Sequence, residues 1–153
     1  MEQKISFDTA LSQLSSGNPQ AAAKLCAEGL EKYPGDANLL CLAAKANLAL
    51  KKFDIAETYI EEAIRLFPDF AAAFETYGDL SLVQDKASKA RTAYETAMRL
   101  DPTRAVTHDK IDRAKQLEKD REAEQAHRKL TRHISFETEI KQAREFENAG
   151  DLR

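Results

Sequence analysis

Residues 1–104 carry short apolar stripes with the three- and four-residue spacing of amphipathic helices, separated by polar turn residues. The first stripe ends at Gly17–Asn18, and Pro19 suits the first turn of the next helix. Its apolar members are Ile5, Phe7, Ala10, Leu11 and Leu14. The pattern predicts an all-α chain of short helices joined by tight turns.

The stripes repeat with a period of 34 residues, which is the spacing of Pro34, Pro68 and Pro102. Other positions superimpose at the same distance: Ala22, Ala56 and Ala90; Cys26, Ile60 and Tyr94; Gly29, Ala63 and Ala97. A fixed period of this length is the signature of a repeat architecture, in which stacked units bury a continuous core.

Each unit reads as two helices, at about residues 37–50 and 53–67 in the second copy. Small residues recur where two helices cross, so we expect Ala56→Leu or Gly78→Leu to overpack a crossing. Asp36 and Asp69 are predicted to cap the first helices of the second and third units. Cys26 is predicted to lie in the core.

The pattern resembles the tetratricopeptide repeat family. The third copy carries the resemblance most fully, in Phe74, Tyr77, Gly78, Ala90, Tyr94, Ala97 and Pro102. The second copy matches at Leu40, Ala43, Ala44, Ala56, Ile60, Ala63 and Pro68, and the first at Ala10, Ala22, Cys26, Gly29 and Pro34. The resemblance implies a right-handed α-α superhelix of three hairpins (3–36, 37–70 and 71–104) whose first helices line a concave groove.

A charged helix is expected over residues 105–133. Val106, Ile111, Ala114 and Leu117 are predicted to cover the open end of the third repeat. Asp112 stands where the repeats place a small residue, so the segment is not a fourth full repeat. The helix is interpreted as the solvating cap that such arrays need. A partner-binding or dimerising helix is the alternative, although no sustained heptad supports it.

The final segment, 134–153, reads as an unpaired helix, the first of a further repeat. From Phe136 onward its stripe consists of Ile140, Ala143, Phe146 and Ala149, and Gly150–Asp151 resembles the first turn at Gly17–Asn18. The second helix that would pack on it is missing. We therefore expect the chain to be cut at the start of a second array. The alternative is a genuine C-terminus whose last helix folds back or docks on another chain.

The resemblance also places candidate peptide-binding residues on the first helices: Phe7, Leu11, Asn38, Cys41, Lys45, Glu75 and Asp79. The surface is apolar at one end and acidic at the other, which suits a ligand with apolar anchors and a basic residue. The alternative is that these side chains are merely solvated. Family members that clamp acidic chaperone tails use Lys, Asn and Arg at positions held here by Phe7, Leu11, Leu42, Ala72 and Thr76. We therefore expect no binding of such tails by that mode.

Composition narrows the class of partner. The net charge is −3 and the pI is about 5.7. These values give no electrostatic reason to expect nucleic acid or an anionic membrane. No signal peptide is visible and no apolar run approaches transmembrane length. With two cysteines and no secretory signal, we expect a cytoplasmic protein.

The sequence offers no catalytic constellation. His108, His127 and His133 lie on or just after the charged helix, and His127 and His133 do not share a helical face. We predict no metal, no cofactor and no enzymatic activity for this chain, and a protein-protein interaction scaffold as its function. Two alternatives stay open: the N-terminal array of a larger, sulfotransferase-like enzyme, and a scaffold that forms homo-oligomers through its C-terminal helices.

Overall fold

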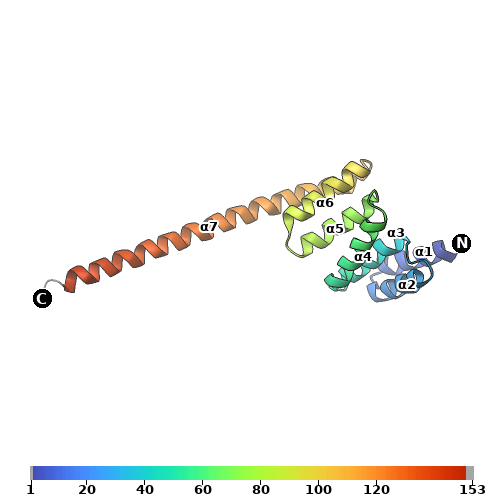
Figure 1. Cartoon of the computed structure of the whole chain (residues 1–153), viewed down its shortest axis with the longest axis horizontal. Helices are drawn as coiled ribbons and strands as arrows, with labels where there is room; N and C mark the ends of the chain where they lie inside the picture. Colours follow the sequence, from blue (N-terminus) through green and yellow to red (C-terminus); the bar gives the residue numbers. More distant parts are fainter. Residues whose placement is uncertain (1, 151–153) are drawn as a thin grey trace. The chain divides into compact units, whose positions relative to one another are not determined.

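The computed structural model describes residues 2–150, and side chains for 7–104 and 106–148. Within those residues there are seven helices and no strand, which confirms the all-α prediction. Figure 1 shows the first six as three successive hairpins. The bounds are α1 Glu2–Ser15, α2 Pro19–Lys32, α3 Ala37–Ala49, α4 Phe53–Leu66, α5 Ala71–Val83, α6 Ala87–Leu100 and α7 Ala105–Gly150.

Each hairpin turns at a residue with a left-handed backbone. These are Gly17 (φ 79°), Lys51 (φ 59°) and Asp85 (φ 69°), spaced one 34-residue period apart. Glycine adopts this conformation without steric cost, whereas lysine and aspartate do not. The repeat therefore imposes the same backbone at all three turns, although only the first has the residue that fits it best.

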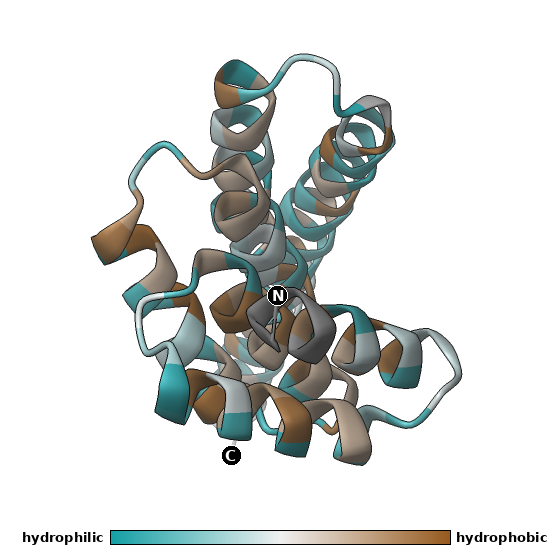
Figure 2. Ribbon diagram, turned by 90° about the vertical axis from the view of Figure 1, so that its right-hand side faces the viewer, coloured by the Kyte–Doolittle hydropathy of each residue, from teal (hydrophilic) through white to brown (hydrophobic). Residues whose placement is uncertain are grey.

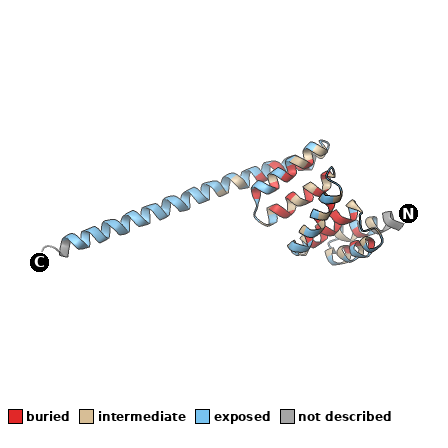
Figure 3. Ribbon diagram, viewed as in Figure 1, coloured by how far each residue is buried: buried red, intermediate tan, exposed pale blue. Residues whose placement is uncertain are grey.

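The core of the hairpins consists of small and apolar residues on facing helices. Ala10, Cys26, Ala44, Ile60 and Tyr94 are all completely buried. Cys26 thus lies in the core, as predicted. In Figure 2 apolar and polar segments alternate along the helices, and Figure 3 shows buried residues in every hairpin. The amphipathic stripes of the sequence become buried clusters that follow one another along the hairpins, because no single hairpin can bury its own apolar face.

The two predicted helix caps behave differently. The Asp36 carboxylate accepts a hydrogen bond from the Leu39 amide at 2.9 Å, which confirms the first cap. The N-cap of α5 is Phe70, with no side-chain cap bond, so the prediction for Asp69 is wrong. The backbone turn closed by the Phe70 amide on the Phe67 carbonyl (3.1 Å) places Asp69 one residue too early.

Helix α7 is continuous, whereas the sequence suggested separate helices over 105–133 and 134–153. No proline and no glycine occurs between Ala105 and Gly150, so nothing in the sequence interrupts the backbone hydrogen bonding. Residues 151–153, including the Asp151 of the predicted turn, lie outside the described residues.

The chain forms two compact units, one ending at Lys115 and one beginning at Gln116. In the first unit Ile111 and Ala114 pack with Tyr94 and Ala90, as predicted for covering residues. Thr107 is also fully buried. The predictions for two other covering residues are wrong, because Val106 is 66% exposed and Leu117 is 38% exposed. Positions 107, 111 and 114 share one helical face, and 106 and 117 fall beside it.

The second unit is a single helix with nearly every side chain exposed (Figure 3). An ion pair between successive turns supports it, with Arg128 2.6 Å from Glu124. Each such exposed pair contributes about 0.3–0.5 kcal/mol.

Candidate functional site

The seven candidate residues all lie on the first helix of a hairpin. We call them the first-helix surface: Phe7 and Leu11 on α1, Asn38, Cys41 and Lys45 on α3, and Glu75 and Asp79 on α5. Their exposure differs widely. Asn38 is exposed and Leu11 is 42% exposed, whereas Cys41 (5%) and Glu75 (8%) are buried. Only part of the predicted surface is therefore accessible to a ligand.

The acidic end of this surface is occupied by basic residues of the same chain. Lys110 Nζ lies 2.8 Å from Glu75 Oε1 and 2.9 Å from Asp79 Oδ1. Arg104 donates from Nε to Glu75 Oε2 at 2.8 Å, and its Nη2 bonds the same oxygen. The Tyr94 hydroxyl donates to Asp79 Oδ1 at 2.8 Å. These five residues form an ion cluster that joins α5, α6, α7 and the loop before α7.

Burial and hydrogen bonding act in opposite directions on the cluster. Burial alone would raise the pKa of Glu75, but hydrogen bonds from Lys110 and Arg104 outweigh it and lower the pKa. Burial would likewise lower the pKa of Lys110, and its bonds to Glu75 and Asp79 raise it instead. The pKa of Tyr94 is raised, first by burial and then by Asp79. The Glu75 carboxylate and the Lys110 ammonium group therefore stay charged, and the Tyr94 phenol stays protonated, at neutral pH.

The middle of the surface carries a positive charge that has no acidic partner. Lys45 is half-buried and forms no ion pair within the described residues. The positive charges of Lys45 and Arg104 both act to lower the pKa of the Cys41 thiol. Burial raises the pKa of the Cys41 thiol to about 11 despite these two charges. The thiol is thus protonated at neutral pH and is not a nucleophile.

The sequence analysis missed Arg104 and Lys110 as parts of the site. One signal was present: Glu75 and Asp79 are one helical turn apart, and Lys110 follows them by about one repeat, 35 and 31 residues later. The signal was weak because α7 departs from the repeat pattern. Which carboxylate a long lysine side chain reaches depends on the packing of α7 on α5 and α6.

Two other classes of site receive no support from the part of the chain that the structure describes. Within it, no group of three His, Cys, Asp or Glu side chains is placed to hold a metal ion. None of the described helices combines the length and the apolarity needed to cross a membrane.

The fold and this surface define a helical-repeat protein built from stacked hairpins. The family model for the tetratricopeptide repeat matches residues 41–105. Residues 41–105 therefore carry the tetratricopeptide repeat pattern, as the sequence resemblance predicted. No curated protein matches it in sequence.

Several solved tetratricopeptide domains share the fold. The first such domain of human RPAP3 is 21% identical, with a TM-score of 0.74 over 79% of this chain and 95% of that one. The Sgt2 domain from Aspergillus fumigatus is 19% identical, with a TM-score of 0.71 over 83% and 82%. The first domain of Spaghetti (RPAP3), solved with the HSP90 peptide SRMEEVD, is 21% identical, with a TM-score of 0.67 over 74% and 90%.

Proposed function

We propose that this protein is a non-catalytic interaction scaffold that binds a peptide or partner protein along the first-helix surface. The proposal is based on the positions and exposure of Leu11 and Lys45. They occupy equivalent positions 34 residues apart on α1 and α3, which are in contact. One is a large apolar side chain that is 42% exposed, and the other is a base that forms no ion pair in the part of the chain that the structure describes. Together they offer an apolar contact beside a charge.

The ion cluster changes the ligand that we expect. Glu75 and Asp79 are already paired with Arg104 and Lys110, so a basic ligand residue would have to displace an existing ion pair. Lys45 faces no such competition. We therefore propose a ligand segment with an apolar anchor and an acidic side chain, in place of the basic segment that the sequence suggested. Such complementarity contributes mainly orientation and association rate.

A peptide selection on the full chain tests this proposal. Selected peptides should combine an apolar with an acidic residue, and Lys45→Glu should weaken their binding about tenfold, or 1.4 kcal/mol. Lys24→Glu, which changes the same charge on the exposed face of α2, serves as the matched control and should leave binding unchanged. Equal affinities for wild type and Lys45→Glu in calorimetry would contradict the assignment.

Chaperone tails are not the proposed ligand, although the Spaghetti domain was solved with an HSP90 peptide. Of the five positions where the clamp needs polar or basic side chains, Leu42 (3%) and Thr76 (0%) are buried here. Phe7, Leu11 and Ala72 offer no charge. Titration of the chain with SRMEEVD should show no saturable binding below about 1 mM. Micromolar binding would show that this chain recognises such tails by another arrangement.

The alternative of an array within a larger enzyme has a structural parallel. The chain resembles 22% of the Thermobaculum terrenum O-GlcNAc transferase chain, at 20% identity with a TM-score of 0.69. In that case the first-helix surface would dock a protein substrate. The intact mass of the native polypeptide, captured with an antibody to residues 1–104, distinguishes the two cases: a mass near 17.1 kDa favours the adaptor.

A further inference from the structure

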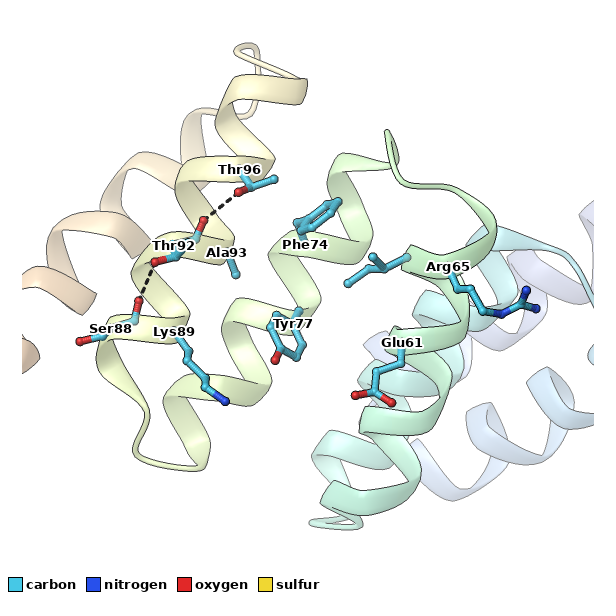
Figure 4. Close-up of a pocket in the computed structure, with 10 residues that line it drawn as sticks. Glu61, Arg65, Phe74, Tyr77, Ser88, Lys89, Thr92, Ala93 and Thr96 are labelled. Carbon is cyan, nitrogen blue, oxygen red and sulfur yellow. Dashed lines mark hydrogen bonds between the residues drawn. The ribbon is translucent and has the colours of Figure 1, made fainter.

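An apolar groove of about 650 Å³ lies on a side of the hairpins that the first-helix surface does not use. Figure 4 shows α4 and α6 as its walls, with the rings of Phe74 and Tyr77 from α5 between them. Its other apolar members are Ile64 on α4 and Ala93 on α6. We call this the acceptor groove. Glu61 and Lys89 lie at its edges, and Lys89 is exposed and forms no ion pair within the described residues.

A second apolar surface lies uncovered on α7. Phe136 is 61% exposed, Ile140 is 37% exposed and Phe146 is 85% exposed. With Ala143 they follow spacings of four, three and three residues, so they share one side of the helix. We call them the α7 stripe. Leu130 and Ile134, also exposed, lie on a different side of the helix, so α7 has no continuous seam for a coiled coil with its own copy.

The dimensions of the two surfaces agree. From Phe136 to Phe146 the helix advances about 15 Å, at 1.5 Å per residue, and the 14-residue wall formed by α6 is about 21 Å long. A short amphipathic helix laid between two helices is a recurrent mode of recognition, with anchors at successive helical turns. The α7 stripe has this arrangement of anchors.

The charges agree as well. The charged side chains that line the acceptor groove are Arg65 and Lys89 against Glu61, a net charge of +1. Residues 136–147 carry four acids and two bases, a net charge of −2: Glu137, Glu139, Glu145 and Glu147 against Lys141 and Arg144. Glu139 and Glu147 fall on the same side of the helix as the α7 stripe, where they can meet Lys89.

We propose that the α7 stripe of one molecule docks in the acceptor groove of a second copy of this chain. The lining of the acceptor groove and the residues around the α7 stripe carry opposite net charges, so a second copy of this chain can supply the other side of the contact. This assigns a partner surface to the self-association that the sequence left as an alternative. It does not rest on peptide binding, because none of its residues belongs to the first-helix surface.

Sedimentation equilibrium of the full chain tests the helix side of the contact. We expect a concentration-dependent dimer that Ile140→Glu/Phe146→Glu weakens about 100-fold, because hydrophobic anchors carry most of the binding energy. Leu130→Glu/Ile134→Glu adds the same charges on another side of α7 and should leave the dimer intact. Circular dichroism verifies that both variants remain helical.

A charge reversal tests the groove side. Lys89→Glu should weaken the dimer about tenfold, and Glu139→Lys/Glu147→Lys on the same chain should restore it. A dimer that depends on the α7 stripe but ignores Lys89→Glu would overturn the assignment of the groove. A chain that stays monomeric up to about 1 mM would overturn the proposal altogether. If the stripe were nevertheless protected in that monomer, it would be docked on its own chain, which also contradicts the proposal.

Discussion

The second and third hairpins solve the same packing problem with residues of different size. Where the two helices cross, α3 and α4 bring Ala44 and Ile60 together, both completely buried. At the same positions α5 and α6 have Gly78 and Tyr94. A methyl group at Gly78 would lie 2.6 Å from Cδ1 and 2.8 Å from Cζ of the Tyr94 ring. The larger aromatic residue therefore requires the smaller partner, although the backbone repeat is the same.

The two hairpins also use one register position for different purposes. Lys45 on α3 and Asp79 on α5 are 34 residues apart. Lys45 forms no ion pair among the residues that the structure describes, whereas Asp79 accepts from the buried Tyr94 hydroxyl and pairs with Lys110. The difference teaches that the repeat sets where a side chain lies. The element that packs next to it decides whether it is available to a ligand or contributes to stability.

Breaking the Gly78–Tyr94 contact should have the largest effect. Gly78→Ala is expected to destabilise the protein by about 3 kcal/mol, at the upper end for overpacking, because the buried and hydrogen-bonded ring cannot move away. Urea unfolding measures the loss. Gly35→Ala is the control, since the nearest atom to its added methyl is 4.0 Å away, and it should be nearly neutral.

The comparison of the two hairpins also suggests a second substitution that should restore stability to Gly78→Ala. Gly78→Ala/Tyr94→Ile copies the Ala44–Ile60 pair into the third hairpin and should recover part of the lost stability. Recovery will be incomplete because Asp79 loses the bond from the tyrosine hydroxyl. A double variant no more stable than Gly78→Ala would show that the two hairpins are not packed equivalently.

Removing the charge at Glu75 should have the next largest effect. Glu75→Gln leaves Arg104 and Lys110 partly buried with one carboxylate fewer and should cost about 2 kcal/mol, less than for a fully buried pair because both bases reach solvent. Chemical denaturation measures the change. Glu62→Gln removes an exposed carboxylate from the Arg65 ion pair and should change stability little.

The pH dependence of unfolding tests whether the stability lost in Glu75→Gln is caused by the missing charge. The pKa of Glu75 is lower in the folded protein than its ordinary value of 4.5, so its contribution is present above pH 4.5 and disappears as pH falls through the lowered value. The difference between wild type and Glu75→Gln should therefore be full at pH 7 and much smaller near pH 2. Urea midpoints for both proteins across this range provide the measurement. A difference that does not vary with pH would mean that shape, not charge, causes the loss.

The smallest effects are expected from substitutions at the turns of the first and second hairpins. Lys51→Gly should stabilise the protein by about 0.5–1 kcal/mol, because glycine adopts the left-handed backbone without strain. Gly17→Ala should destabilise it by about 1 kcal/mol, because alanine is strained in the left-handed backbone. The added methyl would meet no atom within 4 Å, so a steric clash does not contribute. Thermal unfolding resolves both changes. Effects of the same sign would contradict the equivalence of the two turns.

Much of the local structure could be predicted from the sequence. The hairpin helices, the crossing residues and the Asp36 cap follow from the 34-residue period and from side-chain chemistry that acts within a few residues. The errors concern helix phase and continuity. Asp69 lies one residue before the cap position, Val106 and Leu117 fall beside the buried face of α7, and the expected break in that helix is absent. The errors at Asp69, Val106 and Leu117 amount to small shifts along the chain or around a helix, which a periodic pattern does not resolve. The break is absent because no proline or glycine lies between Ala105 and Gly150.

The sequence by itself determined the repeat, the all-α class and the helices that carry the candidate residues. These features depend on the helical spacing of apolar residues and on the 34-residue period, which can both be seen in the sequence. Only the tertiary structure decided what the candidate residues do. Glu75 and Asp79 stabilise the fold because α7 and the loop before it bring Arg104 and Lys110 to them, across about one repeat of sequence. Among the described residues, none forms an ion pair with Lys45. The energy of a charge depends on its nearest partners in space, and the packing of α7 on the third hairpin supplies those partners.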